Sequence, residues 1–322
     1  MRKFLFCSLT FLLFFIAFAL IVYPERYIKA CYEGVTLWGI SVMPSLLPFF
    51  FLSLLITNLG ITANISNKLR KPTALLYNTN GVASFVQLMS FISGYPVGAK
   101  LIAELYKERI ITSEEGSKIS VFTSTSGPMF VIGSVGIGMF SSKKVGVILL
   151  VSHLLSAVIN GVIFRKVGAK KVKRTLKKLT VNPYKGNILY DCAYGATLSC
   201  LIVGAFIAVF YVFSNIVNDF NLLAPFNALF TFIFGDKEKA RAFCAGLIEC
   251  TNGCILFAKT KGSLTLPLTS FIISFGGLSI LFQSVAFLKE ANVNVKFFIL
   301  GKITQAIISF IICYILSLLF YR

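Results

Sequence analysis

The strongest candidate for chemistry in this sequence is a short polar run inside apolar sequence, AGLIECTNG at 245–253. It contains a glutamate, a threonine and an asparagine, namely Glu249, Thr251 and Asn252. A carboxylate at membrane depth costs about 2.5–3.5 kcal/mol on insertion scales, so it is usually retained for a ligand or an ion. We expect Gly246 and Gly253 to break the flanking helix, which is tolerated at that depth where backbone lines a cavity. The stretch therefore predicts part of a transport site.

Three further interruptions fall inside apolar sequence: SGYPVGAK at 93–100, TSTSGP at 123–128 and SFGGLS at 274–279. Interrupted helices leave amides and carbonyls without intrahelical partners, and they place partial charges at the helix ends. Breaks at corresponding positions of two halves indicate a binding site near the membrane midplane. Alternatively, the small residues only allow helices to pack closely. The candidate substrate-binding residues here are Ser93, Gly94, Tyr95, Thr123, Ser124, Thr125, Ser126, Gly127, Gly276, Gly277 and Ser279.

Three polar side chains outside the breaks complete the candidate set: His153, Gln283 and Lys302. His153 is the one histidine in the chain and would carry a proton or contact an anion, or else form an interhelical hydrogen bond. Lys302 would bind an anion or extend to the membrane interface. Gln283 is a donor for substrate or for a neighbouring helix. Glu249 also has an alternative role to ligand binding, as a structural carboxyl that is protonated or hydrogen-bonded.

The sequence contains no pattern typical of an enzyme. We find no nucleophile–base pair, no phosphate-binding loop and no metal-ligand spacing, so no catalysis, cofactor or metal is expected. Eight cysteines are scattered, and the close pair Cys250 and Cys254 lacks the further ligands that a metal site needs. They are interpreted as small buried hydrophobic residues.

Composition sets the fold class. The chain of 322 residues is 57% hydrophobic and only 13% charged, with 33 phenylalanines. No soluble domain has enough interior for that much apolar surface, so we predict an all-α, polytopic integral membrane protein. The net charge of +19 lies mostly at the ends of apolar segments. Anchoring at the cytoplasmic side and contact with anionic lipids explain this charge better than binding of nucleic acid.

Apolar runs predict the elements along the chain. Spans are expected at Phe4–Tyr23, Val35–Thr57, Val121–Phe140, Val145–Phe164, Leu198–Val217 and Phe297–Phe320. Residues 82–97 are too short to span and predict a re-entrant hairpin, followed by an interfacial helix at 101–111. The predicted organisation is an N-terminal transmembrane helix and loop (1–34), a first repeat (35–164), a basic cytoplasmic linker (165–186) and a second repeat (187–322).

The two repeats are predicted to have inverted topology. Each has a long span, a polar break, a second break and a closing span, and the spacing from Gly127 to Gly276 equals that from His153 to Lys302. With the basic linker inside, corresponding spans run in opposite directions, as in many transporters. The orientation of the second half stays open, because Lys237, Lys239, Arg241, Lys259 and Lys261 then lie outside.

Several motifs resemble one family. These are PSLLPFF at 44–50, SGYPVGAK at 93–100, FTSTSGP at 122–128, HLLSA at 153–157, GLIECTNG at 246–253, and FGGLS at 275–279 with Gln283. In this order they resemble the sporulation integral membrane proteins of the YlbJ type, which are similar to nucleoside-recognition (gate) proteins. The resemblance covers the chain from about Val35 to its end. It implies two gate-like repeats and transport of dipicolinate during spore formation, in the cell membrane or outer forespore membrane of a spore-forming bacterium.

The substrate chemistry leaves alternatives open. Dipicolinate is a dianion, which suits helix N-termini, hydroxyls, His153 or Lys302, whereas Glu249 would repel it. Glu249 would instead hold a coupling cation or proton, or accept a hydrogen bond from a neighbouring threonine. A cation-coupled nucleoside permease, in which Glu249 and Asn252 contact ribose hydroxyls, is one alternative function. A scaffold for spore-envelope assembly that transports nothing is the other.

Overall fold

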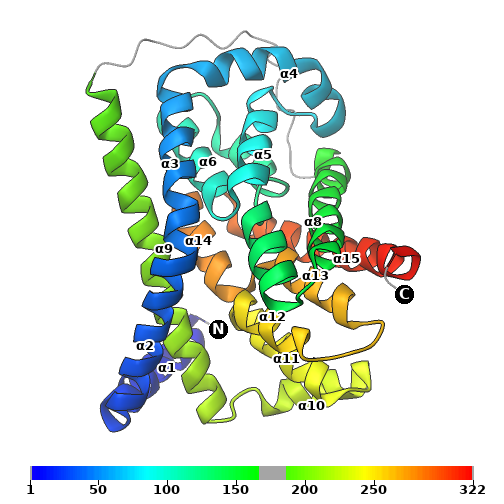
Figure 1. The fold of residues 1–322 in the computed structure, drawn as a ribbon. Helices are drawn as coiled ribbons and strands as arrows, with labels where there is room; N and C mark the ends of the chain where they lie inside the picture. The colour runs from blue at the N-terminus through cyan, green and yellow to red at the C-terminus, as the bar shows by residue number, and fades with distance from the viewer. Residues whose placement is uncertain (1, 167–185, 321–322) are drawn as a thin grey trace.

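Two long helical segments form one side of the protein (Figure 1). The computed structural model describes residues 2–166 and 186–320. After α1 (Arg2–Val22), helix α2 (Pro24–Leu37) continues through a π-helical turn, η1 (Trp38–Val42), into α3 (Met43–Asn58). Because proline has no N–H, Pro44 and Pro48 remove donors from this helix, and the π turn directly before them widens it without ending it. The predicted span at 35–57 is therefore the upper part of a longer kinked helix.

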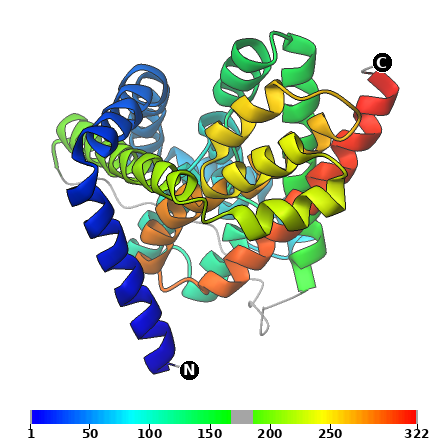
Figure 2. The ribbon, with the colours of Figure 1, turned by 90° about the horizontal axis from the view of Figure 1, so that it is seen from below.

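Helix α9 (Ile188–Asp219) runs antiparallel to this segment (Figure 1). The two backbones approach closely, since a Cβ on Gly34 would lie 2.9 Å from the Cα of Ala208. Gly204 leaves room for the ring of Trp38, whose indole N–H donates to the carbonyl of Cys200 at 3.0 Å. We call α2, η1, α3 and α9 the frame. Helix α1 projects from the body and contacts the frame at α2 and α9 (Figure 2).

A helical hairpin follows the frame helix in each half. In the first half, α4 (Ile61–Tyr77) leads into α5 (Val82–Ser93) and α6 (Val97–Lys107). In the second half, α10 (Ala224–Phe234) leads into α11 (Lys237–Ile248) and α12 (Cys250–Ala258). Figure 1 shows α4, α5 and α6 at one end of the molecule and α10, α11 and α12 at the other. Each half thus contains a long helix followed by a hairpin, and the two hairpins lie at opposite ends.

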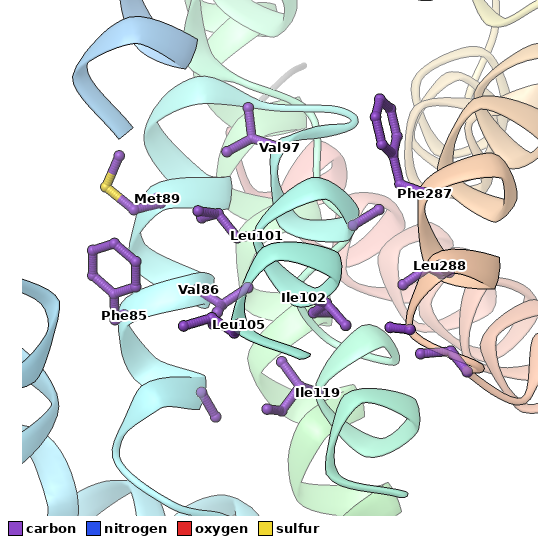
Figure 3. Close-up of a cluster of buried hydrophobic side chains, with 14 of the residues drawn as sticks. Phe85, Val86, Met89, Val97, Leu101, Ile102, Leu105, Ile119, Phe287 and Leu288 are labelled. Atoms are coloured by element: carbon purple, nitrogen blue, oxygen red, sulfur yellow. The ribbon is translucent and has the colours of Figure 1, made fainter. Parts of the chain in front are cut away.

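The predicted interfacial helix at 101–111 is wrong. Helix α6 begins at Val97 and is the returning arm of the first hairpin, with Leu101, Ile102 and Leu105 almost fully buried. Figure 3 shows these side chains between α5 and the neighbouring residues Ile119, Phe287 and Leu288. The charges of this helix mislead, because Lys100 is itself buried, donating to the carbonyl of Gly195 on α9 at 3.1 Å.

A broken helix and a closing span complete each half. Helix α7 (Ser113–Ser120) is followed by irregular backbone at 121–128 and by a π-helix, η2 (Met129–Met139). The predicted span at 121–140 is thus helical only from Met129. Helices α8 (Lys143–Ile163) and η3 (Phe164–Lys166) end the first half. The counterparts are α13 (Thr265–Phe275), α14 (Gly277–Glu290) and α15 (Val295–Phe320), and α8 packs against α15.

The described residues contain helices and no strand, which confirms the all-α prediction. Four helical segments are long and apolar enough to cross a membrane: Lys143–Lys166, Ile188–Asp219, Thr265–Glu290 and Val295–Phe320. Large apolar side chains such as Phe232 and Ile21 are exposed, as expected of surfaces that face lipid. The protein is a polytopic membrane protein. Most of the predicted linker, 167–185, lies outside the described residues.

Candidate functional site

The two breaks of each half pack against each other. In the first half, a Cβ on Gly94, whose φ is +86°, would lie 2.5 Å from the amide nitrogen of Gly127. In the second half, a Cβ on Gly277, with φ of +71°, would lie 2.8 Å from the carbonyl of Gly246 and 3.1 Å from the amide of Cys250. Only glycine permits both the positive φ and the close approach. We call the region where these four breaks meet, together with Tyr95, His153 and Lys302, the crossing.

Lys302 on α15 is fully buried at the crossing. Its ammonium group donates to the hydroxyl of Tyr95 at 2.7 Å, to the carbonyl of Ser124 at 2.9 Å and to Oε1 of Gln305 at 3.4 Å. It also lies 4.6 Å from the centre of the Tyr95 ring. All of these partners are neutral. The side chain therefore does not extend to the membrane interface, and no carboxylate among the described residues pairs with it.

Tyr95 connects the two halves. Its hydroxyl accepts from Lys302 and donates toward the carbonyls of Ile273 and Ser274, each at 3.2 Å, at the end of α13. The residue belongs to the first break, whereas these acceptors and Lys302 belong to the second half. One phenol thus joins the turn of the first hairpin to the break between α13 and α14.

His153 also bridges the halves. The backbone N–H of Ser126 donates to its Nε2 at 2.8 Å, and its Nδ1 lies 2.7 Å from the hydroxyl of Ser274. Because a peptide N–H can only donate, Nε2 carries no proton, and the imidazole is neutral with its proton on Nδ1. Both ring nitrogens are therefore occupied by the protein in this conformation.

Glu249 stands at the turn of the second hairpin, with extended backbone between α11 and α12. Its carboxylate accepts from the amide of Thr251 at 3.1 Å and from that of Asn252 at 2.8 Å. The group is 6% exposed and caps its own helix. An acid in this position satisfies orphan amides and offsets the positive end of the helix dipole. The side chains of Thr251 and Asn252 are half-buried beside it.

Gly246 and Gly253 do not break the helix, contrary to expectation. They lie inside α11 and α12, and the break falls at Glu249 between them. A Cβ on Gly253 would collide with the backbone of Gly246, so the pair brings the two arms into contact. Helix packing by small residues, the alternative considered for all of the breaks, is thus the role of these two glycines.

The remaining candidates occupy the same region. Ser90 on α5 donates to the carbonyl of Thr123 and lies 2.9 Å from the hydroxyl of Thr125, which attaches the irregular segment to the first hairpin. Gln283 donates to Ser279 at 3.2 Å, one turn earlier on α14. The hydroxyls of Ser93 and Ser124 and the amide nitrogen of Gln305 are buried, and no described residue pairs with them.

Helix N-termini at the crossing differ in how they are capped. Helices α6, η2 and α14 begin there without a side-chain cap, whereas α12 is capped by Glu249. Uncapped N-terminal amides attract anions, and a buried ammonium adds to that field. In this conformation helix N-termini without side-chain caps face the crossing, and the carboxylate of Glu249 is occupied by α12.

Sequence reasoning missed two residues at this site. Asn160 on α8 donates to the carbonyls of Val121 and Gly301, both at 2.9 Å, and accepts from Thr304 on α15. It lies two turns after His153 on the same helix face, and that spacing is a signal that could have identified it. Gln305, one turn after Lys302 on α15, is the second, because its sequence context favours a contact between helices over binding of a ligand.

Comparison with known proteins supports the family resemblance. The sporulation integral membrane protein YlbJ of Bacillus subtilis is 29% identical to the chain in an alignment of 319 positions that covers 91% of the chain and 78% of that protein. The chain is therefore similar to a sporulation membrane protein of the YlbJ type. No family model and no solved structure matches it. The motifs behind the YlbJ-type resemblance, among them SGYPVGAK, FTSTSGP and GLIECTNG, form the breaks that meet at the crossing.

Proposed function

We propose that the protein transports a small carboxylate metabolite across the membrane and binds it at the crossing. The observation that carries this proposal is the ammonium of Lys302, fully buried with only neutral partners. A buried charge without a counter-charge is costly, and such residues inside membranes usually serve substrates or ions. A substrate carboxylate would supply the missing counter-charge.

The surrounding helix ends support an anion over a cation or a neutral ligand. Three N-termini at the crossing have no side-chain cap, and the hydroxyls of Ser93 and Ser124 have no partner among the described residues. Glu249, the acid that a cation would need, already accepts two amides of α12. This occupation weakens the alternative of a nucleoside permease whose Glu249 contacts ribose.

The inverted halves suggest how transport proceeds. Lys302 and His153 are fully buried, so the substrate reaches them only after the hairpins move relative to the rest of the protein. Inverted repeats around a buried site are the common basis of alternating access. We propose that one hairpin opens the crossing toward each side of the membrane.

We further propose that the substrate is dipicolinate and that transport serves spore formation. The YlbJ-type resemblance supports this, because the relative is named for sporulation. Dipicolinate carries two carboxylates on a small aromatic ring, and both features fit a donor-lined crossing that contains Tyr95. The membrane involved would be the cell membrane or the outer forespore membrane.

Uptake into proteoliposomes tests the proposal. Purified protein is reconstituted, and uptake of labelled dipicolinate is compared with uptake of labelled uridine. We expect dipicolinate to enter and uridine to stay out, and we expect Lys302→Met to reduce dipicolinate uptake by about 100-fold or more, as removal of a fully desolvated charge contact does. Uptake of uridine alone would favour the permease. Uptake of neither by well-folded protein would favour the scaffold.

A further inference from the structure

Gln305 lies beside Lys302, and the NH₂ group of its side-chain amide has no hydrogen-bond partner among the described residues. The residue is fully buried on α15, and its Oε1 is 3.4 Å from the ammonium nitrogen of Lys302. A buried amide group without a partner is unusual in a native structure and calls for an explanation, such as a ligand or a water molecule.

The chemistry of the two side chains fixes how the amide points. An ammonium group only donates, so the oxygen of the Gln305 amide faces Lys302 and the NH₂ group faces away from it. The unpaired NH₂ group, on the other side of the same amide, offers two further N–H donors. Ser124 belongs to the same group, because Lys302 donates to its carbonyl at 2.9 Å while its own hydroxyl is buried and unpaired.

We propose that Lys302 and Gln305 form a two-donor clamp for one carboxylate of the substrate. The ammonium would exchange its 3.4 Å bond to Oε1 of Gln305 for one carboxylate oxygen, and the released amide would turn so that its NH₂ group donates to the other, with the Ser124 hydroxyl as a third donor. Two oxygens on one planar group match two adjacent donors, whereas a neutral amide or hydroxyl substrate matches them only in part. This inference rests on the proposed function and deepens it, because it names the substrate group that is recognised and the residues that recognise it.

Binding to the purified full-length protein tests the clamp. Isothermal titration calorimetry in detergent is carried out with dipicolinate and with its neutral diamide, on the wild type, Gln305→Leu and Gln305→Glu. We expect Gln305→Leu to weaken dipicolinate binding about 10- to 100-fold, as loss of a hydrogen bond to a charged group does. Gln305→Glu should weaken it further, since the new carboxylate would pair with Lys302 and repel the ligand.

Two controls separate a binding role from a structural one. Ser317→Ala changes a buried side chain on the same helix that bonds only to the carbonyl of Tyr314, and dipicolinate binding should be unchanged. The diamide should bind weakly to the wild type and to Gln305→Leu alike, because the clamp discriminates only carboxylates. A merely structural Gln305 would lower the thermal midpoint and weaken both ligands equally, and that result would overturn the clamp.

The clamp and the proposed function fail in different ways. If the wild type binds dipicolinate and Gln305→Leu binds it equally well, the clamp is wrong and the transport proposal stands, with water as the partner of the amide. If the folded wild type binds no carboxylate, the proposed function is wrong and the clamp falls with it. Retained dipicolinate binding in Gln305→Glu would also overturn the clamp.

Discussion

The two hairpins solve the same structural problem by different chemistry. Each ends in a turn at the crossing, where the first amides of the returning helix cannot have partners within that helix. The second hairpin supplies an acid of its own, Glu249, which accepts two of those amides. The first hairpin turns at Gly94, Tyr95 and Pro96 and provides no acid. The two hairpins thus make an asymmetric site, because only the second caps its returning helix with an acid of its own.

The largest expected effect concerns two glycines of the hairpins that lie directly against neighbouring backbone. A methyl group at Gly98 would meet the backbone of Thr123, and one at Gly253 would meet that of Gly246. We expect Gly98→Ala and Gly253→Ala each to cost about 3 kcal/mol, because backbone cannot move aside as a side chain can. Thermal unfolding in detergent measures this.

Gly133 provides the matched control, because a methyl group there would meet nothing within 4 Å. Gly133→Ala should leave the unfolding midpoint nearly unchanged. A tolerated Gly98→Ala beside a damaging Gly253→Ala would show that the first hairpin has room to move and the second has not, which would sharpen the contrast between the halves.

A smaller effect is expected at the bridge between the halves. His153→Leu leaves the buried N–H of Ser126 and the hydroxyl of Ser274 without their partner, at a cost of about 1–3 kcal/mol. The control Ser156→Ala removes a hydroxyl that bonds only within its own helix, and it should change the unfolding free energy little. Equal effects of the two substitutions would argue against a bridge.

Substitutions of Glu249 test the difference between the two hairpins most directly. Glu249→Ala should destabilise the protein by about 1–2 kcal/mol, the usual cost of removing a helix cap. Glu249→Gln keeps one acceptor oxygen and should cost less. If the anion site belongs to the first half, dipicolinate binding measured by calorimetry should remain within a few-fold of wild type in both variants. Loss of uptake in a stable Glu249→Gln would place this acid in the transport cycle.

The smallest effect concerns the loop that opens the second hairpin. Asp236 caps α11, and its hydrogen bond from Lys239 lowers the pKa of the carboxyl below the usual value of 3.8. Its contribution is therefore complete above that usual value and is lost as pH falls through the lowered pKa. Asp236→Ala should cost about 1 kcal/mol at pH 7.

In the first half, Thr112 caps α7 and forms a capping box with Glu115, and Thr112→Ala removes this cap. It should cost a similar amount at pH 7, because the same kind of orphan amide loses its acceptor. Thermal unfolding at pH 7 and pH 3 measures both. A destabilisation by Asp236→Ala that persists unchanged at pH 3 would contradict the sign derived for this carboxyl.

The breaks could be predicted because their residues depart from helical chemistry locally. Glycine, proline and hydroxyl runs at 93–100, 123–128 and 274–279 disfavour a helix wherever they occur in apolar sequence. The stretch at 245–253 was also recognised, but the exact position of its break was not. Glycines there are compatible with a helix once another backbone packs on them, and that packing is a tertiary fact that no local pattern contains.

Partners across the crossing could not be predicted. Lys302 contacts Tyr95, more than 200 positions away, and Gln305 matters only because Lys302 uses its oxygen and leaves its nitrogen. Burial of α6 was missed for a similar reason, since Lys100 and Glu104 give this helix the charge pattern of a surface element. The residue types indicated which segments form the candidate site, but only the fold shows which of their side chains are in contact.

The contact between Trp38 and Gly204 has a mechanical consequence. The indole occupies the space of a missing side chain and donates to the carbonyl of Cys200 one turn away, so the two frame helices cannot slide past each other by one residue without losing both contacts. The two frame helices are therefore expected to move as one unit, whatever displacement exposes the centre of the protein.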